Sequence, residues 1–139
     1  MSPNLDEQLC ARYPKIFVNR YADMQTTAMC WGIGCGDGWY NILDQLCHNI
    51  QSHTDWQNRE TVKVPQVVAT QVKEKFGGLR FYYDGGDEYI SGAAAMAESM
   101  SEVTCEECGA PGQQRGGGWI YTACDAHTQL EHLSKQESI

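Results

Sequence analysis

Residues 64–84 read VPQVVATQVKEKFGGLRFYYD, and this stretch is the strongest folding signal in the chain. It consists of two runs rich in β-branched and aromatic residues on either side of Gly77-Gly78, a pair that favours a two-residue hairpin turn. The second run alternates between two faces, with Leu79, Phe81 and Tyr83 on one and Arg80 and Tyr82 on the other. The stretch therefore predicts an antiparallel β-hairpin.

Helical patterns flank this hairpin on both sides. Before it, Asn4 is a candidate N-cap of a short helix, and a longer helix opens at Asp37 or Gly38 and runs to about Ser52. After it, Asp87 caps a third helix. The apolar stripe expected on the second helix comprises Trp39, Ile42, Leu43, Leu46, Cys47 and Ile50. The stripe expected on the third comprises Tyr89, Ile90, Ala93, Met96, Ala97, Met100 and Val103.

The order of these elements indicates the fold class. A helix, a loop, a second helix, the hairpin, a third helix and a cysteine-rich end favour an α+β fold, with three helices and a central β-hairpin. The chain has 139 residues, enough for one compact domain with a small appendage. We expect residues 1–103 to form a small α+β domain and residues 104–139 to form a zinc-binding module packed on it, unless the two make a single domain.

The cysteine-rich end reads CEECGAPGQQRGGGWIYTACDAH over residues 105–127. Cys105 and Cys108 form a Cys-x-x-Cys pair, and the following Gly109 relieves crowding in the tight turn that such a pair needs. Downstream, Cys124 and His127 supply a second pair at the spacing that zinc modules use. The sequence therefore predicts one zinc ion in a finger like a treble clef or a zinc ribbon, with His132 as the alternative fourth ligand.

This zinc ion is expected to be structural. Four protein ligands leave no open position for water, which a catalytic zinc requires. A module of roughly 25 residues buries too little apolar surface to fold alone, so the metal supplies its folding energy.

The remaining cysteines have a weaker pattern. The chain has seven cysteines and no secretory signal in its polar N-terminus, which favours metal binding over disulfides. Cys30 and Cys35 could form a second metal site with Cys10, Cys47 or His48, but buried free cysteines are the simpler expectation.

Residues 30–40, CWGIGCGDGWY, are too rich in glycine for a helix. One interpretation is a partner-binding loop in which Trp31, Asp37 and Trp39 make the contacts. The simpler interpretation is a buried turn, in which both tryptophans cover the core and Asp37 caps the next helix.

The hairpin carries the only basic patch of the sequence. Lys73, Lys75 and Arg80 alternate with aromatic residues that include Tyr82, a combination that can stack on and neutralise a nucleic-acid strand. The alternative is a solvated charged face, which the acidic flanks favour. The net charge is −8 for the whole chain but +3 for residues 59–83. Non-specific binding to nucleic acid is therefore not expected.

The third helix offers an acidic surface instead. Glu98 and Glu102 are four residues apart and are expected to share a face, away from a core stripe that contains Met96 and Met100. Residues 84–107 contain seven acidic residues and neither lysine nor arginine. Such a face could bind a basic protein, or it could serve only for solvation.

Other function classes find little support. The sequence contains no nucleophile elbow, phosphate loop, metalloprotease pair or paired-carboxylate signature, so an enzyme is the less favoured interpretation. No apolar run approaches the roughly 20 residues that cross a bilayer. We therefore expect a cytoplasmic protein without a membrane partner.

Four phrases of the sequence, PKIF, CWGIGCGDGWYNILDQLC, QVKEKFGGLRFYYDGG and CEECGAPG…GGGW…TACDAH, resemble a family of small bacteriophage and prophage proteins. The resemblance covers about residues 13–127 and implies a phage origin and a treble-clef-like zinc end. It also implies a protein that acts by binding a host protein or by blocking a defence complex, because small phage proteins often act in this way. The alternative is a nucleic-acid-binding or processing accessory that uses residues 73–83.

Overall fold

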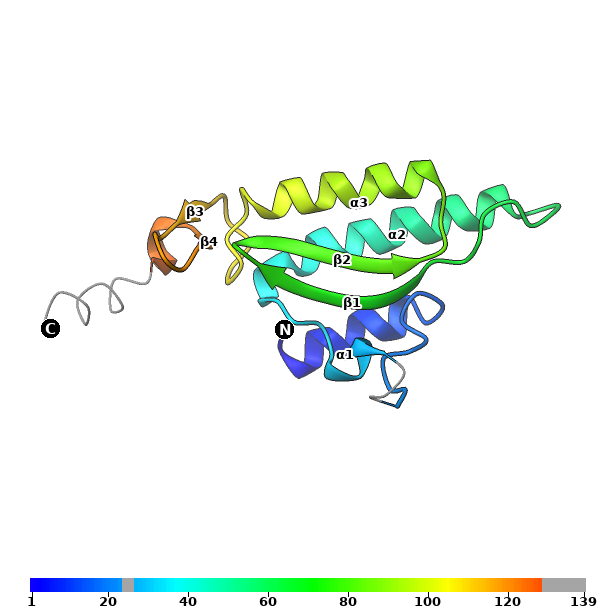
Figure 1. Ribbon diagram of the computed structural model, residues 1–139, viewed down its shortest axis with the longest axis horizontal. Helices are drawn as coiled ribbons and strands as arrows, with labels where there is room; N and C mark the ends of the chain where they lie inside the picture. The colour runs from blue at the N-terminus through cyan, green and yellow to red at the C-terminus, as the bar shows by residue number, and fades with distance from the viewer. Residues whose placement is uncertain (24–26, 129–139) are drawn as a thin grey trace, which may run out of the picture.

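The structure is a computed structural model that describes residues 1–23 and 27–128 (Figure 1). Three helices and a two-stranded antiparallel sheet confirm the expected α+β class. A second small hairpin follows near the C-terminal cysteines, whereas the treble-clef assignment stays a prediction. The elements in chain order are α1 (Pro3–Arg12), η1 (Ala28–Trp31), η2 (Asp37–Trp39), α2 (Tyr40–Gln57), β1 (Val68–Lys75), β2 (Gly78–Asp84), α3 (Glu88–Ser101), β3 (Gln113–Arg115), β4 (Tyr121–Ala123) and η3 (Asp125–His127).

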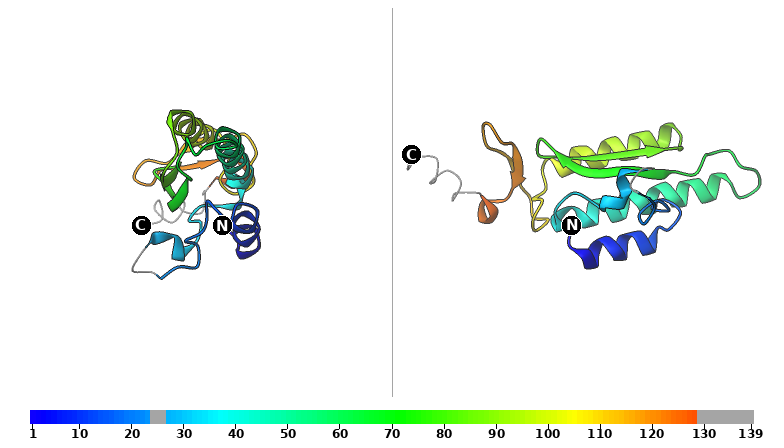
Figure 2. Two further views of the ribbon diagram at one scale, coloured as in Figure 1. Left: turned by 90° about the vertical axis from the view of Figure 1, so that its right-hand side faces the viewer. Right: turned by 60° about the horizontal axis from the view of Figure 1, so that its bottom comes forward.

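The helices pack around the β1–β2 hairpin. Helix α2 lies between α1 and α3, and α3 also contacts β2 (Figures 1 and 2). The expected apolar stripe of α2 is confirmed, because all six of its residues are buried. The helix continues beyond Ser52 to Gln57. Within it, the hydroxyl of buried Thr54 donates a hydrogen bond to the Ile50 carbonyl at 2.8 Å. No helix of the described residues has the length and apolar character that a bilayer crossing requires.

The outer edge of β2 is covered by side chains of α3. The backbone N–H of Leu79 donates to Ser101 Oγ at 2.8 Å, and that of Phe81 donates to Glu98 Oε1 at 3.2 Å. An unpaired strand edge invites pairing with other chains, and side-chain acceptors remove that hazard. Two polar residues of α3 thus stand in for a third strand.

The outer edge of β1 is covered by the chain before α2. Gly34 forms a parallel bridge beside Lys73, donating to the Val72 carbonyl at 2.8 Å and accepting from Glu74 N at 2.9 Å. Ala69 N donates to the Ile16 carbonyl at 2.8 Å. Both edges of the two-stranded sheet are therefore hydrogen-bonded from within the same chain.

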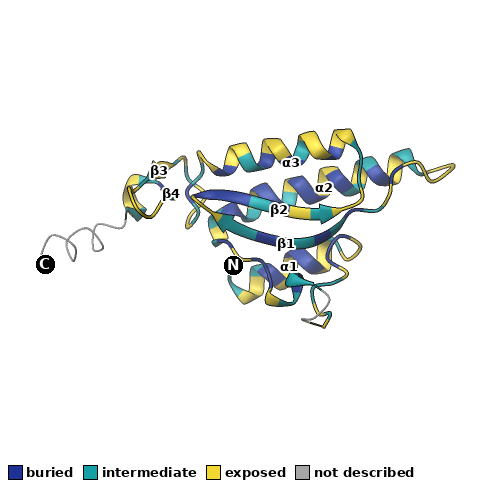
Figure 3. Ribbon diagram, viewed as in Figure 1, coloured by how far each residue is buried: buried dark blue, intermediate teal, exposed yellow. Residues whose placement is uncertain are grey.

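This arrangement corrects the expected orientation of α3. Its buried residues are Ile90, Ala94, Ala97 and Ser101, whereas Met96 and Met100 are 63% and 48% exposed (Figure 3). Tyr89 and Val103 are exposed as well. The helix turns its small residues to the hairpin because Ser101 and Glu98 must reach the β2 edge. Glu98 and Glu102 both lie beside β2, as expected of a shared face, but Glu98 is half-buried and hydrogen-bonded to Phe81, and the binding of a partner by this face stays a prediction.

A buried ion pair fixes α1 against the loop before α2. Asp6 Oδ1 accepts from Arg20 Nε at 2.8 Å, and its Oδ2 accepts from the Ile33 backbone N–H at 2.7 Å. Helix α1 begins with Ser2 as its N-cap and Pro3 in its first turn, so the expected N-cap at Asn4 is wrong. Proline suits this position because its missing N–H would have had no partner there.

Glu98 of α3 and Glu102, the C-cap of that helix, give a matched test of edge covering. Glu98→Ala removes the acceptor for the Phe81 N–H and should lower the free energy of unfolding by about 1 kcal/mol. Glu102→Ala removes an exposed carboxylate and should change it by less than about 0.5 kcal/mol. Urea unfolding followed by tryptophan fluorescence measures both, and equal effects would contradict the role of Glu98.

Candidate metal centre

Four side chains converge at the C-terminal end of the described chain. The donor atoms of Cys105, Cys108, Cys124 and His127 all lie within 4.8 Å of one another. The Cys108 and Cys124 sulfurs are 3.7 Å apart, and His127 Nδ1 lies 3.7 Å from Cys105 Sγ and 3.2 Å from Cys124 Sγ. Tetrahedral coordination with bonds of about 2.0–2.3 Å would place such donors about 3.5–3.8 Å apart. The cluster thus has the size and the chemistry to hold one metal ion.

A tight turn presents the first two cysteines. Gly109 has φ of +80° and donates its N–H to the Cys105 carbonyl at 2.9 Å, while Cys105 N donates to the Ala110 carbonyl at 2.8 Å. Glycine adopts this left-handed conformation without the strain that a side chain would cause. The turn places both sulfurs on one side, as the Cys-x-x-Cys-Gly spacing predicts.

The second pair follows the small hairpin of β3 and β4. Strand β4 pairs antiparallel with β3, and Cys124 comes directly after it. The chain then closes into η3, where His127 N donates to the Cys124 carbonyl at 3.1 Å and turns the imidazole back to the sulfurs. The alternative ligand His132 lies outside the described residues.

The electrostatics favour the thiolate, the form that binds metals, at Cys105 and Cys124. At Cys108 the backbone N–H of Ala110 lowers the pKa, but burial and the hydrogen bonds with Cys105 and Cys124 outweigh it and raise that pKa. Burial raises the pKa of the Cys105 thiol, but the backbone N–H groups of Cys124, Cys108 and Glu107 outweigh it and bring that pKa to about 6. A hydrogen bond from His127 lowers the pKa of Cys124. The same contact raises the pKa of His127.

A carboxylate stands behind the imidazole. His127 turns Nδ1 to the sulfurs, and its Nε2 lies 3.8 Å from Glu107 Oε2. Outer partners of this kind orient a ligating histidine and strengthen it as a donor.

The glycine-rich loop of residues 32–38 forms hydrogen bonds with the metal-binding turn at Glu106, a contact that the sequence did not predict. Gly38 N donates to the Glu106 carbonyl at 2.7 Å, and Gly36 N donates to Glu106 Oε2 at 2.8 Å. A Cβ on Gly38 would lie only 2.2 Å from the Cys105 carbonyl oxygen. Four glycines at every second position from 32 to 38 were a signal of close backbone approach, but they did not reveal what approaches.

The two tryptophans that flank this loop differ in burial, since Trp39 is buried and Trp31 is exposed. Trp39 is fully buried and donates its indole N–H to the Thr104 carbonyl at 2.9 Å, so it belongs to the core and not to a partner surface. Trp31 is 76% exposed, so the expectation that it covers the core is wrong. Asp37 does not cap α2, because the N-cap of that helix is Trp39. The Asp37 carboxylate instead accepts a hydrogen bond from the Ser2 backbone N–H at 2.6 Å and holds the N-terminus in place.

The other cysteines form no second centre among residues 1–23 and 27–128. Cys35 is buried and Cys30 is half-buried, and the only metal-competent group in that part of the chain is the C-terminal one. Burial raises the pKa of Cys10, Cys35 and Cys47, which keeps them protonated. They behave as the small apolar core residues that were expected.

The basic residues of the hairpin lie on its outer face. Lys73 pairs directly opposite Arg80, Gln71 pairs opposite Tyr82, and Lys75 lies at the exposed end of β1. These residues are brought together on the sheet, whereas the metal centre lies beyond the hairpin turn (Figure 1).

The contact between loop and turn can be tested with two glycines. Gly38→Ala should force the metal-binding turn away from the loop, lowering the free energy of unfolding by about 1–3 kcal/mol and weakening metal binding. Gly117→Ala is the control, since a Cβ there meets nothing within 4 Å. Chelator competition and thermal unfolding measure both effects, and a Gly38→Ala protein with unchanged metal affinity would argue against the contact.

The comparisons with known proteins add no relative to this picture. No protein-family model matches the chain, and neither the curated proteins nor the solved structures contain a match.

Proposed function

We propose that this protein is a zinc-stabilised accessory protein of bacteriophage type, which acts in the host cytoplasm by binding a basic segment of a host protein. The observation that carries the proposal is an apolar groove between α2 and α3, two helices that contain neither lysine nor arginine. The resemblance to phage and prophage proteins supplies the biological setting, and inhibition of a host defence complex is one outcome of such binding.

Zinc is the metal that the donor set favours. Three thiolates and one imidazole are soft to intermediate ligands, and zinc accepts them in tetrahedral sites. Because the protein supplies all four ligands, no position is left for water or substrate, and the ion serves to hold the fold together. The contacts of the loop with Glu106 carry that effect from the metal-binding turn to the helical part of the chain.

The groove lies where α2 and α3 pack side by side. It has a volume of about 360 Å³, and both Met96 and Met100 contribute to its wall. Methionine side chains adapt to different shapes and are common on surfaces that bind peptide helices. Its lining residues are Asn41, Ile42, Gln45, Leu46, Asn49, Ala93, Met96, Ala97 and Met100.

The charge of the two helices selects the partner. Neither α2 nor α3 contains lysine or arginine, and each carries two acidic residues, of which Asp44 is ion-paired with Arg12 of α1. Just after α3, Glu102 is exposed and accepts no hydrogen bond that would restrain it in the way that Glu98 is restrained. An apolar groove in an acidic surface is complementary to an amphipathic helix with a basic face, which we take as the occupant.

The metal is tested by elemental analysis of the purified protein. We expect one zinc per chain, lost in Cys105→Ser and in Cys124→Ser, with a large fall in thermal stability because the metal contributes folding energy. Full zinc content in both cysteine variants would contradict the assignment. Loss of zinc in His132→Ala with retention in His127→Ala would make His132 the fourth ligand.

The groove is tested with an uncharged double variant. Met96→Gln with Met100→Gln keeps helix propensity and net charge but makes the groove polar, so binding to a synthetic lysine- and leucine-rich amphipathic helix should weaken at least about tenfold. Val62→Gln is the matched control, because Val62 is the most exposed large apolar residue and lies outside the groove. Isothermal titration calorimetry measures the affinities.

Two results would overturn this proposal. Equal affinity of the double variant and the Val62 control would place the peptide elsewhere. A concentration-dependent dimer, dispersed by the same two substitutions in light scattering, would assign the groove to a second copy of the chain.

A further inference from the structure

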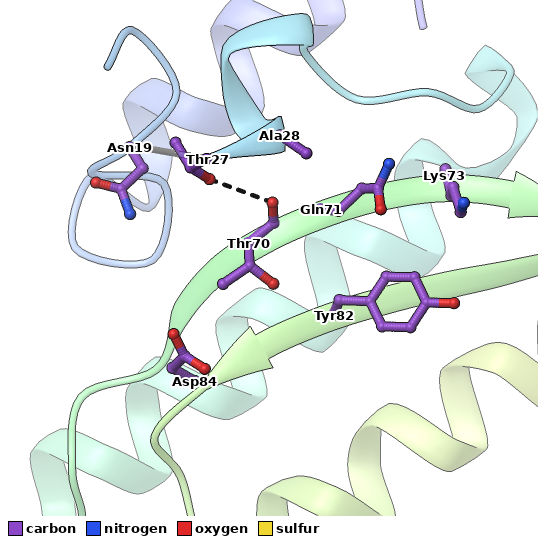
Figure 4. A pocket seen from close by; sticks show the side chains of 8 residues that line it. All are labelled: Asn19, Thr27, Ala28, Thr70, Gln71, Lys73, Tyr82 and Asp84. Carbon is purple, nitrogen blue, oxygen red and sulfur yellow. Dashed lines mark hydrogen bonds between the residues drawn. The ribbon is translucent and has the colours of Figure 1, made fainter. Parts of the chain in front are cut away.

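The outer face of the hairpin forms a second, polar groove, separate from the one between the helices. It has a volume of about 530 Å³, and the β strands form one wall while the segment before α2 forms the other (Figure 4). Its lining residues are Asn19, Thr27, Ala28, Thr70, Gln71, Lys73, Tyr82 and Asp84. The Thr27 hydroxyl donates to the Thr70 carbonyl at 3.3 Å and joins the two walls.

Among the described residues, Lys73 and Lys75 form no ion pair with a carboxylate, whereas the Arg80 guanidinium turns back to the Leu79 carbonyl and lies near Glu102. Lys73 lies directly opposite Arg80 on the neighbouring strand, a like-charge pairing that destabilises a sheet. In the described part of the chain, the carboxylate ion pairs of the structure involve other basic residues: Arg12, Arg20, His53, Arg115 and His127. In a chain of net charge −8, a groove lysine such as Lys73 that forms no ion pair is suited to an external anion.

The groove also contains two neutral groups suited to contact a nucleobase, the Tyr82 ring and the Gln71 amide. Tyr82 is 42% exposed, and Lys73 Nζ lies 6.0 Å from the centroid of its ring. Gln71 pairs opposite Tyr82, so its amide stands beside that ring. Asp84 lies at one end of the groove and Lys73 at the other (Figure 4). The groove therefore has an anionic end, an aromatic and amide centre, and a cationic end.

We propose that this groove binds a base and phosphate, as part of a single-stranded nucleic acid. The base stacks on Tyr82, where the Gln71 amide can donate or accept hydrogen bonds at its edge and the Asp84 carboxylate can accept them. The phosphate lies at Lys73, and the next phosphate along the strand meets Lys75. Phe76, exposed at the hairpin turn, offers a second ring beyond it.

A nucleic-acid duplex cannot make the contacts that this groove offers to a single strand. Bases stacked and paired within a helix cannot lie on Tyr82, and the net charge of −8 repels a duplex backbone beyond the few contacts of the hairpin. A free nucleotide shares the same chemistry as one unit of a single strand. The length dependence of binding separates these two sources.

The test is a titration of the full chain, labelled with ¹⁵N, with AMP, CMP, twelve-residue single strands of dA or dC, and a twelve-base-pair duplex. We expect amide shifts centred on Gln71, Lys73 and Tyr82, and affinity for the strands at least about tenfold above that for the mononucleotides. If Lys73 and Lys75 meet two phosphates, affinity should fall about sevenfold between 50 and 200 mM salt. Equal affinity for strand and mononucleotide would identify a free nucleotide as the ligand.

Matched variants complete the test. Tyr82→Ala should weaken strand binding at least about fivefold, whereas Tyr82→Phe keeps the stacking surface and should bind nearly as well. Lys73→Gln should weaken binding and flatten the salt dependence. Lys63→Gln, which removes the same charge outside the groove, should leave both unchanged; circular dichroism verifies that each variant is folded.

The proposal is overturned by any of three results. These are the absence of saturable shifts with every probe, duplex binding as tight as single-strand binding, and equal losses in the Lys73 and Lys63 variants. None of these results tests the groove between α2 and α3, because the peptide proposed to bind there would lie on a different surface of the molecule.

Discussion

A two-stranded sheet has two unpaired edges and little stability of its own, and this constraint organises the rest of the molecule. The chain satisfies it from both sides. Ser101 and Glu98 of α3 accept hydrogen bonds from the edge of β2, and Gly34 bonds along the edge of β1. Because α3 must bring polar side chains to a strand edge, small residues fill its inner face and the methionines are left outside. The apolar groove is thus a consequence of how the sheet is closed.

The loop that covers β1 also supports the metal centre. Its backbone bonds to the sheet through Gly34, and a few residues later Gly36 and Gly38 bond to Glu106 inside the metal-binding turn. Trp39 adds an indole hydrogen bond to Thr104 and buries its ring in the core. A metal ion at the four ligands would therefore stabilise more than its own short hairpins, since the turn it fixes is bonded to the loop that completes the sheet.

The two proposed binding surfaces differ because the hairpin separates them. Helices α2 and α3 cover one side of the strands and carry only acidic charges, while the other side keeps the basic residues of the strands themselves (Figures 1 and 4). A basic peptide and an anionic strand would be drawn to opposite sides by the same separation of charge. The two proposals therefore concern different surfaces of the chain, and neither depends on the other.

Local sequence determined the elements, and tertiary contacts decided which side of each one is used. The turn at Gly77-Gly78, the stripe of α2 and the spacing of the four ligands are encoded within a few residues, because they depend on backbone geometry and nearest neighbours. In α3, alanines and methionines alternate around the helix, so periodicity alone could not tell the inner face from the outer one. That choice depended on the edge of β2, and the burial of Trp39 depended on a hydrogen bond to Thr104, 65 residues away. Such contacts leave no local pattern, since only the fold brings the two partners together.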